Sequence, residues 1–339
     1  MKRPTHGIAY EVLCLQIADG GRGDVLLGGS ASRARHAVQP FLVGDSFPSV
    51  YFEFPLIGDP FLDVTLLYNT LEPGARIASE AAAGTEAVID WYARECSAID
   101  NVSFGFELDT KDPELPSAAI HFQPREHLDL VEPFCEAVGE PERARLYLDL
   151  AARMPERWPL SFFGMFRGRP GSPLRVCGYL GDDEKHACAS DEGHVAEVFE
   201  TVGFTAYDSA MVADIATLMA LAPETADFQF DVYPDGTIGD TFAIDVSFGI
   251  ARPEVVHESF ETGACGRVLG CFEEWGMADG RWKLAADVAF ARALPAEDED
   301  GSLKKFGFSL VPQWVKARWR AGVRQPSKLY YLGSAKFFD

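Results

Sequence analysis

The sequence predicts an α+β fold in which five antiparallel β-hairpins alternate with helices. Short runs that alternate apolar and polar residues occur in pairs, as expected of half-buried strands. Stretches with helical periodicity and helix-capping residues separate the pairs. The hairpin-and-helix unit recurs at intervals of about 55–75 residues, which indicates a repeat architecture.

The strand pattern defines five hairpins. Turn-forming residues support two of them directly, Gly168 to Ser172 in the third and Pro234 to Thr237 in the fourth. The predicted pairs are 25–30 with 49–57, 101–109 with 117–123, 161–167 with 173–180, 227–233 with 239–248, and 304–311 with 327–337.

Helices are predicted between these hairpins. Thr85 is placed to cap the first of them, Pro141 suits the first turn of the third, and Gly203 and Gly276 are natural C-terminal residues. The predicted ranges are 85–96, 125–138, 141–153, 191–202, 207–221, 253–275 and 279–293.

Paired strands exclude a doubly wound parallel sheet, in which single strands alternate with helices. Two packings remain, an open sheet under a helical layer and a closed ten-stranded barrel with helices outside. Closure would remove exposed strand edges, and ten strands leave room for a lumen. No Pro-, Gly- or Ser-rich linker divides the chain, so we expect a single domain over residues 1–339.

Composition limits the possible partners and compartment. The formal charge of −22 disfavours nucleic-acid binding, and no apolar run is long enough for a membrane span or a signal peptide. The seven cysteines lack the paired spacing of disulfides or structural zinc, so we expect a cytoplasmic protein. His186 and His194 flank Cys188, but no fourth ligand supports a metal site there.

One face of the predicted strands is strongly apolar and should meet the helices, as in Phe104, Phe106 and Phe242. The opposite face is polar but rich in tyrosine, which suits an aromatic, polar lumen better than a solvated sheet face. A solvated face remains the alternative. The polar set is Tyr51, Glu53, Ser103, Glu107, His121, Gln123, Arg175, Cys177, Tyr179, Gln229, Asp231, Tyr233, Asp245, Ser247, Ser309, Lys328, Tyr330 and Lys336.

This pattern resembles the ABBA prenyltransferases, whose fold is a ten-stranded antiparallel β-barrel of five αββα repeats with helices outside. The order of the hairpins carries the resemblance, together with three short stretches. Residues 175–179 (RVCGY) and 230–234 (FDVYP) resemble strands with an inward tyrosine. Residues 327–331 (SKLYY) resemble the last strand, including the form seen in the peptide-modifying branch.

The resemblance implies an enzyme that moves an isoprenoid group from an allylic diphosphate, dimethylallyl or geranyl, to an aromatic or peptide side-chain acceptor. It implies no organic cofactor. Its chemistry needs cations for the leaving diphosphate, tyrosine rings to shield a carbocation, and a base. The matching residues are Arg175, Lys328, Lys336 and Arg167 for diphosphate, Tyr179, Tyr233 and Tyr330 for the shield, and Glu53 and His121 as catalytic groups.

Two basic positions of the family are missing, because the strand ending at His121 has no Lys or Arg and Thr241 replaces a cation. Magnesium linked to Glu53 could offset the lumen acids, or Arg167 and Arg292 could reach in. Otherwise the barrel would not handle diphosphates. The alternatives to an enzyme are therefore a non-catalytic barrel that binds a small aromatic ligand or peptide, and a two-layer interaction protein. The basic segment 303–339, of net charge +7, favours an anionic ligand.

Overall fold

The computed structural model describes residues 38, 41–42, 48–72, 74–75, 85–108, 118–297 and 302–338. The predicted strand 25–30 lies outside these residues. The described strands are β1 (Ser49–Pro55), β2 (Asp63–Tyr68), β3 (Ser103–Leu108), β4 (Ala118–Gln123), β5 (Leu160–Met165), β6 (Leu174–Leu180), β7 (Ala226–Val232), β8 (Ile238–Ser247), β9 (Phe290–Glu297), β10 (Leu303–Arg320) and β11 (Val323–Phe338).

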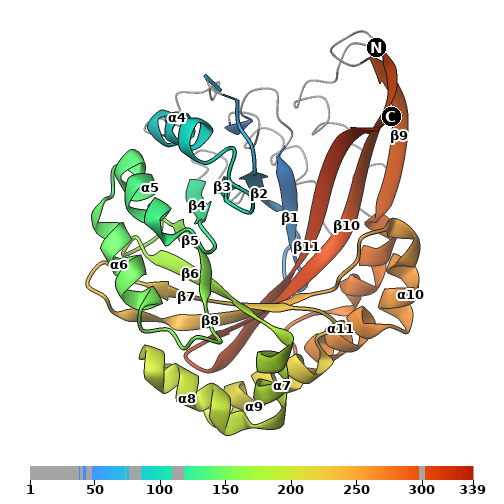
Figure 1. Ribbon diagram of the computed structural model, residues 1–339. Coiled ribbons are helices and arrows are strands. Elements are labelled where there is room, and N and C mark those ends of the chain that lie inside the picture. Colours follow the sequence, from blue (N-terminus) through green and yellow to red (C-terminus); the bar gives the residue numbers. More distant parts are fainter. Residues whose placement is uncertain are drawn as a thin grey trace.

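Ten of these strands form a closed antiparallel barrel (Figure 1). Neighbouring strands pair in chain order from β1 to β8, β8 pairs with the second half of β10, and β11 pairs with both β10 and β1. The remaining strand, β9, pairs with the first half of β10 and stands outside the ring. Of the two packings the sequence allows, the closed barrel is confirmed, and the two-layer sheet with a solvated face is wrong.

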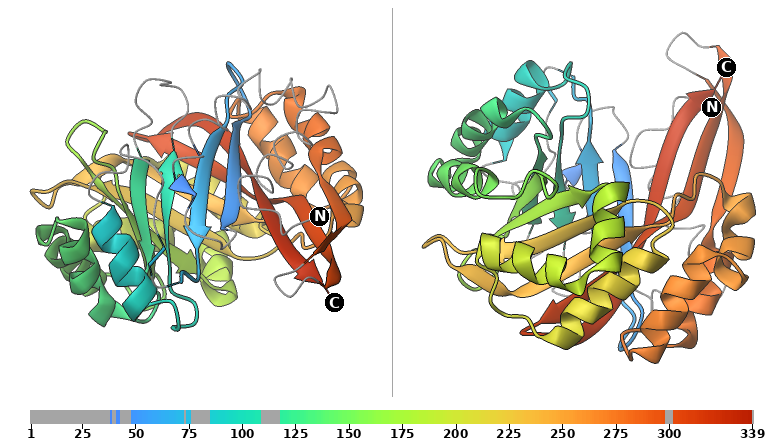
Figure 2. Two further views of the ribbon diagram at one scale, coloured as in Figure 1. Left: turned by 90° about the horizontal axis from the view of Figure 1, so that it is seen from above. Right: turned by 60° about the horizontal axis from the view of Figure 1, so that its bottom comes forward.

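The helices lie around the outside of the barrel, as Figure 2 shows from two further directions. The described α-helices are α4 (Glu86–Glu95), α5 (Val131–Val138), α6 (Glu142–Ala151), α7 (Asp182–Ser190), α8 (Glu192–Val202), α9 (Ser209–Leu221), α10 (Val256–Glu261) and α11 (Ala264–Glu274). Short 3-10 helices cover Leu128–Leu130, Pro253–Val255 and Gly280–Val288.

The apolar strand face packs against these helices, as its period of two predicts. Phe104 of β3 lies 4.8 Å from Tyr92 of α4, and Phe242 of β8 lies 4.8 Å from Phe199 of α8, measured between ring centroids. Phe122 of β4 stacks on Phe134 of α5 at 4.2 Å. Because the apolar face of each strand packs against the helices, the opposite, polar face must line the barrel interior.

The first and last units depart from the predicted boundaries. β1 pairs with β2, a strand the sequence pattern did not reveal because Leu67 is apolar on its inner side. The predicted helix 279–293 is instead a 3-10 helix followed by strand β9. Pro295 suits an edge strand, where a missing N–H costs no ladder hydrogen bond, and it disfavours a helix.

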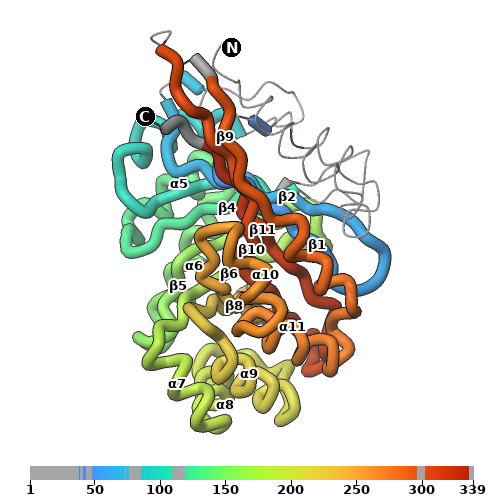
Figure 3. Tube along the Cα trace, turned by 90° about the vertical axis from the view of Figure 1, so that its right-hand side faces the viewer, coloured from blue at the N-terminus to red at the C-terminus, as the bar shows by residue number. Residues whose placement is uncertain are grey.

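The last hairpin is longer than predicted, because β10 and β11 extend well past residues 304–311 and 327–337. Together with β9 these long strands run along one side of the molecule (Figure 3). The predicted helix 253–275 is divided at Gly263. A Cβ there would lie 2.7 Å from the Cα of Ser259, so only glycine allows this close approach.

Among the described residues, none of the helices is long and apolar enough to cross a membrane. The six described cysteines form no disulfide, and five of them are buried.

Candidate active site

The described residues line a wide and a narrow cavity in the barrel lumen. The wide cavity has a volume of about 840 Å³ and the narrow cavity about 230 Å³. Six side chains line both and mark the junction between them: Glu53, Glu107, Arg175, Gln229, Lys316 and Tyr330. Five of these six are in the polar set predicted from the sequence, so the predicted inner face and the observed lumen agree.

At the seam that closes the barrel, Lys328 of β11 binds two carboxylates. Its Nζ lies 3.0 Å from Oε2 of Glu53 on β1 and 2.8 Å from Oδ2 of Asp63 on β2. Burial alone would lower the pKa of Lys328, but the two carboxylates outweigh it and raise that pKa. Lys328 is therefore a fixed cation at the wall of the wide cavity.

Arg175 of β6 is held by Asp231 of β7, with Nε 2.9 Å from Oδ1 and a second hydrogen bond of 3.3 Å. The guanidinium also lies 4.5 Å from the ring centre of Phe166, on which Arg169 stacks at 3.8 Å. Burial opposes the charge of Arg175, but Asp231 and Glu107 raise its pKa. Asp231 and Phe166 thus fix the orientation of this guanidinium at the wall of the wide cavity.

Arg318 of β10 also lines the wide cavity, and it differs from the other cations there. Within the described part of the chain, no ion pair or hydrogen bond engages its side chain. Burial lowers the pKa of Arg318, and the nearby charge of Arg175 lowers it further. Arg318 is half-buried, and a partly desolvated guanidinium without an anionic partner is costly, so an anionic ligand would stabilise it.

His121 of β4 lies in the narrow cavity, with Nε2 3.1 Å from Oε2 of Glu107. The imidazole fills the space above Gly164 on β5, where a Cβ would lie 2.6 Å from Cε1 of His121. Burial opposes ionisation of Glu107, but His121, Arg169 and Arg175 outweigh it and hold its pKa well below the usual range. Glu107 is thus a permanent anion that orients His121.

The narrow cavity has an aromatic wall. The ring of Trp314 on β10 lies 4.7 Å from that of Tyr51 and 5.5 Å from that of Tyr330, between centroids. Opposite each other on β7 and β8 stand Asp227 and Asp245. Burial raises the pKa of Asp227 to about 7 and that of Asp245 to about 6. This half of the lumen is suited to an aromatic, polar ligand.

Of the three tyrosines expected to shield a carbocation, only Tyr330 lines the described cavities, and it lines both. Tyr179 is 38% exposed. The ring of Tyr233 lies beside Gly171 in the turn between β5 and β6. Tyr179 and Tyr233 stand toward strand ends, where the period of two no longer guarantees a place in the lumen.

The other predicted cations are placed differently. Arg167 forms an ion pair with Glu140 and donates to the carbonyl of Val138 at 2.7 Å, outside both cavities, so its predicted reach into the lumen is wrong. Arg292 is exposed on β9, outside the ring. Lys336 of β11 lies opposite Gly307 of β10, and its side chain falls outside the described residues.

Sequence reasoning missed several lumen residues. Lys316 and Arg318 were counted only as part of a basic segment, although they alternate with the apolar residues Val315, Ala317 and Trp319. That alternation predicts a strand with a cationic inner face. Arg169 lies in a turn and Asp63 on the unrecognised strand β2, and neither position carries a pattern that the sequence alone makes visible.

Magnesium linked to Glu53 was one expectation. Glu53 and Asp63 both already bind the ammonium of Lys328. Magnesium prefers octahedral oxygen ligands, so an ion at Glu53 would have to displace a buried cation that is already well placed. The residues present do not fit a magnesium ion held by Glu53.

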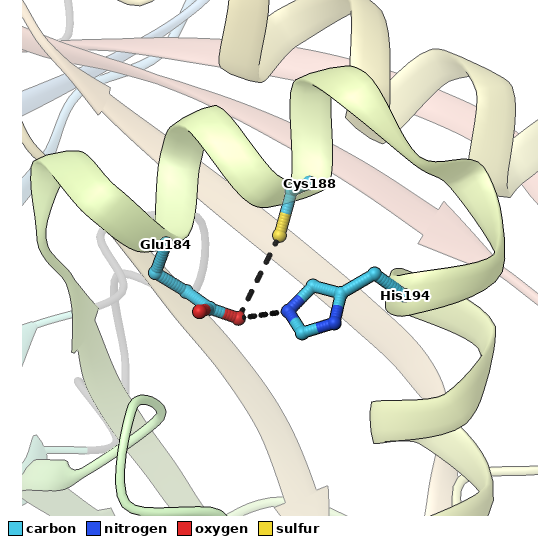
Figure 4. A group of neighbouring side chains, drawn as sticks. All are labelled: Glu184, Cys188 and His194. Carbon is cyan, nitrogen blue, oxygen red and sulfur yellow. Dashed lines mark hydrogen bonds and ion pairs between the residues drawn. The ribbon is translucent and has the colours of Figure 1, made fainter.

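Outside the lumen, Glu184 and Cys188 of α7 meet His194 of α8 (Figure 4). Their ligand atoms lie within 4.8 Å of one another, and no fourth His, Cys, Asp or Glu of the described chain joins them. Glu184 accepts hydrogen bonds from the indole of Trp158 and from His194. The group is thus a buried hydrogen-bond network between helices, and His186 is exposed and takes no part.

The fold of this protein is similar to that of solved structures of other proteins. No protein-family model and no curated protein matches the sequence. The structure is similar to that of 5-dimethylallyltryptophan synthase from Streptomyces coelicolor, with a TM-score of 0.53 and 12% identity over 97% of each chain. It is also similar to the prenyltransferase PriB in its apo form, with a TM-score of 0.53 and 11% identity over 98% of this chain and 96% of that one.

A structure of PriB in a binary complex with product diphosphate matches with a TM-score of 0.50 and 11% identity, over 98% of this chain and 96% of that one. At these identities the likeness establishes the fold. The chain has the ABBA prenyltransferase barrel, and the resemblance stated from its sequence is confirmed at that level.

Proposed function

We propose that this protein is a prenyltransferase that moves an isoprenoid group from an allylic diphosphate to an aromatic or peptide side-chain acceptor in the lumen. The observation that carries the proposal is the division of one lumen into two parts with different chemistry. Arg175, Lys316 and Tyr330 stand at their junction. The wide cavity gathers five Lys and Arg side chains, and the narrow cavity has an aromatic wall.

The wide cavity would take the donor diphosphate. Arg318 has no anionic partner in the described chain, while Arg169, Arg175, Lys316 and Lys328 stand around the same space. When the allylic C–O bond breaks, the diphosphate leaves with the bonding electrons, and these cations stabilise the charge it gains. The cations that the family carries on the strand corresponding to β4 and at the position of Thr241 would thus be replaced from β10 and from the β5–β6 turn.

At the junction, the ring of Tyr330 would shield the allylic cation. It stacks on Trp314, and its opposite neighbour across the β1–β11 pair is Glu53. Burial raises the pKa of Tyr330 well above its usual value, so the phenol stays neutral and offers a ring face rather than a nucleophile. Dimethylallyl or geranyl diphosphate is the proposed donor.

The acceptor would lie in the narrow cavity. A new bond forms between the donor's first carbon and the acceptor ring or side chain, and the acceptor then loses a proton. Glu53 and His121 both line this cavity and are the proposed proton acceptors. Glu53 is restrained by Lys328 and by Thr65, whose hydroxyl donates to it at 3.1 Å.

A product assay tests the proposal. The protein is incubated with dimethylallyl or geranyl diphosphate and a panel of aromatic amines, phenols and indoles, with magnesium or with a chelator, and products are identified by mass spectrometry. We expect prenylated product without added magnesium. Binding of an aromatic acceptor with no product and no diphosphate release from either donor would instead indicate a non-catalytic barrel.

A further inference from the structure

The narrow cavity holds more negative charge than its own cations neutralise. Four carboxylates line it, Glu53, Glu107, Asp227 and Asp245, against three guanidinium or ammonium groups, Arg125, Arg175 and Lys316. In the wide cavity the five Asp and Glu side chains equal the five Lys and Arg side chains in number. The acidic excess is therefore confined to the half of the lumen where the acceptor is proposed to bind.

Each of the three cations near this cavity has a partner other than Asp227 and Asp245. Arg175 is bound to Asp231, and Arg125 can donate to the side-chain oxygen of Gln123 at 2.9 Å once that amide is oriented to accept. Lys316 donates to Gln229 at 3.2 Å and lies farther, 3.7 Å, from Asp245. Little positive charge is therefore left to neutralise Asp227 and Asp245.

Asp227 and Asp245 keep carboxylate oxygens that are unpaired in the described part of the chain, although Oδ2 of Asp245 accepts a hydrogen bond of 2.5 Å from Nε2 of Gln229 and lies 3.7 Å from Nζ of Lys316. Within the described residues, Asp227 has no ion pair and no hydrogen bond through its side chain. The side chain of Asp245 is 9% exposed, and its Oδ1 is buried and accepts no hydrogen bond from the described chain. The two residues are directly opposite on β7 and β8, so each desolvates and repels the other.

A ligand that brings a positive charge would relieve this repulsion, whereas a neutral ligand would only add to the desolvation. The neighbouring wall suits a cation attached to an aromatic ring. Tyr51, Trp314 and Tyr330 present their rings to the same cavity, where they can pack on the acceptor ring and attract an ammonium group.

We infer that the acceptor carries a protonated amine, which binds at Asp227 and Asp245 while its aromatic ring packs on Tyr51 and Trp314. This inference rests on the proposed function, since it names the acceptor class for the same lumen. It also gives Asp227 and Asp245 a role distinct from that of Glu53 and His121: they select and position the acceptor.

The test compares amine and alcohol ligands that are otherwise matched: tryptamine with tryptophol, tyramine with tyrosol, and phenethylamine with 2-phenylethanol. Affinities are measured by calorimetry on the full chain saturated with a dimethylallyl thio-diphosphate. A charge-assisted hydrogen bond predicts that at least one amine binds about tenfold or more tightly than its alcohol. Amine preference below about threefold in every pair overturns the inference.

Variants locate the effect. Asp227→Asn and Asp245→Asn should each reduce the amine preference, and the double variant should abolish it. Asp240→Asn, an exposed aspartate bound to Arg320, is the matched control and should keep the preference. An unchanged preference in the double variant contradicts the inference, as does an equal loss of turnover for amine and alcohol with binding unchanged, which would make the aspartates bases.

The two proposals fail in different ways. If the thio-diphosphate does not bind, the proposed prenyl transfer fails, and amine binding is then measured on the free protein, where the same preference is expected. If the thio-diphosphate binds and amines show no preference, only the acceptor inference fails.

Discussion

Lys328 and Glu53 are joined across the seam where β11 closes the barrel onto β1, with Nζ 3.0 Å from Oε2. Asp63 shares the same ammonium at 2.8 Å. A residue expected from the sequence to bind only the donor therefore also holds two acidic side chains at the wall of the lumen. This double role changes what its replacement should do.

Lys328→Met should destabilise the fold as well as weaken diphosphate binding. It removes the ammonium that binds the buried carboxylates of Glu53 and Asp63, and breaking a buried pair in this way typically costs about 3–5 kcal/mol. Urea unfolding measures the loss. Lys283→Met is the control, because Lys283 is an exposed partner of Glu273 and its removal should cost less than about 1 kcal/mol. Equal stability of the two variants would contradict the buried seam.

Arg318→Gln should behave in the opposite way. Arg318 has no anionic partner in the described chain and lies near Arg175, so its replacement should leave the unfolding free energy unchanged or higher. Affinity for a thio-diphosphate should fall by about 10- to 100-fold, as expected for a lost charge-assisted hydrogen bond. Arg320→Gln, which removes an exposed partner of Asp240, should leave that affinity unchanged. Loss of stability without loss of affinity would remove Arg318 from the donor site.

Tyr330→Leu should increase the share of donor that is hydrolysed rather than transferred. The ring lies at the junction of the two cavities, and a leucine there no longer offers a π face to the cation. Tyr179→Leu is the control, because Tyr179 lines neither described cavity. The ratio of free prenyl alcohol to prenylated product measures the effect. The same ratio in both variants would refute the shielding role of Tyr330.

Amine binding should strengthen as pH rises from about 5 to 8, because an ammonium needs ionised carboxylates. Burial raises the pKa of Asp227 to about 7, Asp245 raises it further, and Arg125 and Lys316 act against them. Burial likewise raises the pKa of Asp245 to about 6. Lys316 and Arg175 lower the pKa of Asp245 and Glu53 raises it. Tyr51 and Cys177, which line the same cavity, have raised pKa values and stay neutral in this range.

Calorimetry across this range tests the prediction. Asp227→Asn should flatten the rise, whereas Asp240→Asn should keep it. The folding stability of the protein without ligand should change in the opposite direction, and fall as pH rises. A carboxyl whose pKa is raised by folding favours the folded state at low pH, and this contribution is lost as pH rises through about 7. Affinity that is constant from pH 5 to 8 would contradict a role for these two carboxyls.

The sequence predicted the hairpins because their signals are local, whereas the choice of a closed barrel over an open sheet rested on the resemblance to the ABBA prenyltransferases. Alternation at residues 227–233 and the turn at Pro234 fix one hairpin without knowledge of the rest of the chain. It also placed Glu53, His121, Arg175, Lys328 and Tyr330 in the lumen, because the period of two assigns a face to each residue within a strand.

Errors arose where tertiary contacts decide. Arg167 follows β5, and its side chain forms an ion pair with Glu140 outside the barrel. The alternation of residues along a strand does not predict this contact. Pairing with β10 makes a strand of residues 290–297, although the neighbouring alanines favour a helix. Arg318 was overlooked as an individual residue because the extent of β10 depends on its pairing with β8 and β11.

The most direct test of the central claim is thio-diphosphate binding to the lumen, measured by unfolding of wild-type protein and Arg318→Gln in chelated buffer. At 100 times its dissociation constant, one ligand should stabilise the wild type by about 2.7 kcal/mol, and the variant by clearly less at the same concentration. No stabilisation of the wild type by dimethylallyl, geranyl or farnesyl thio-diphosphate, or equal stabilisation of wild type and variant, would contradict the assignment of this barrel as a prenyltransferase with its donor site at Arg318.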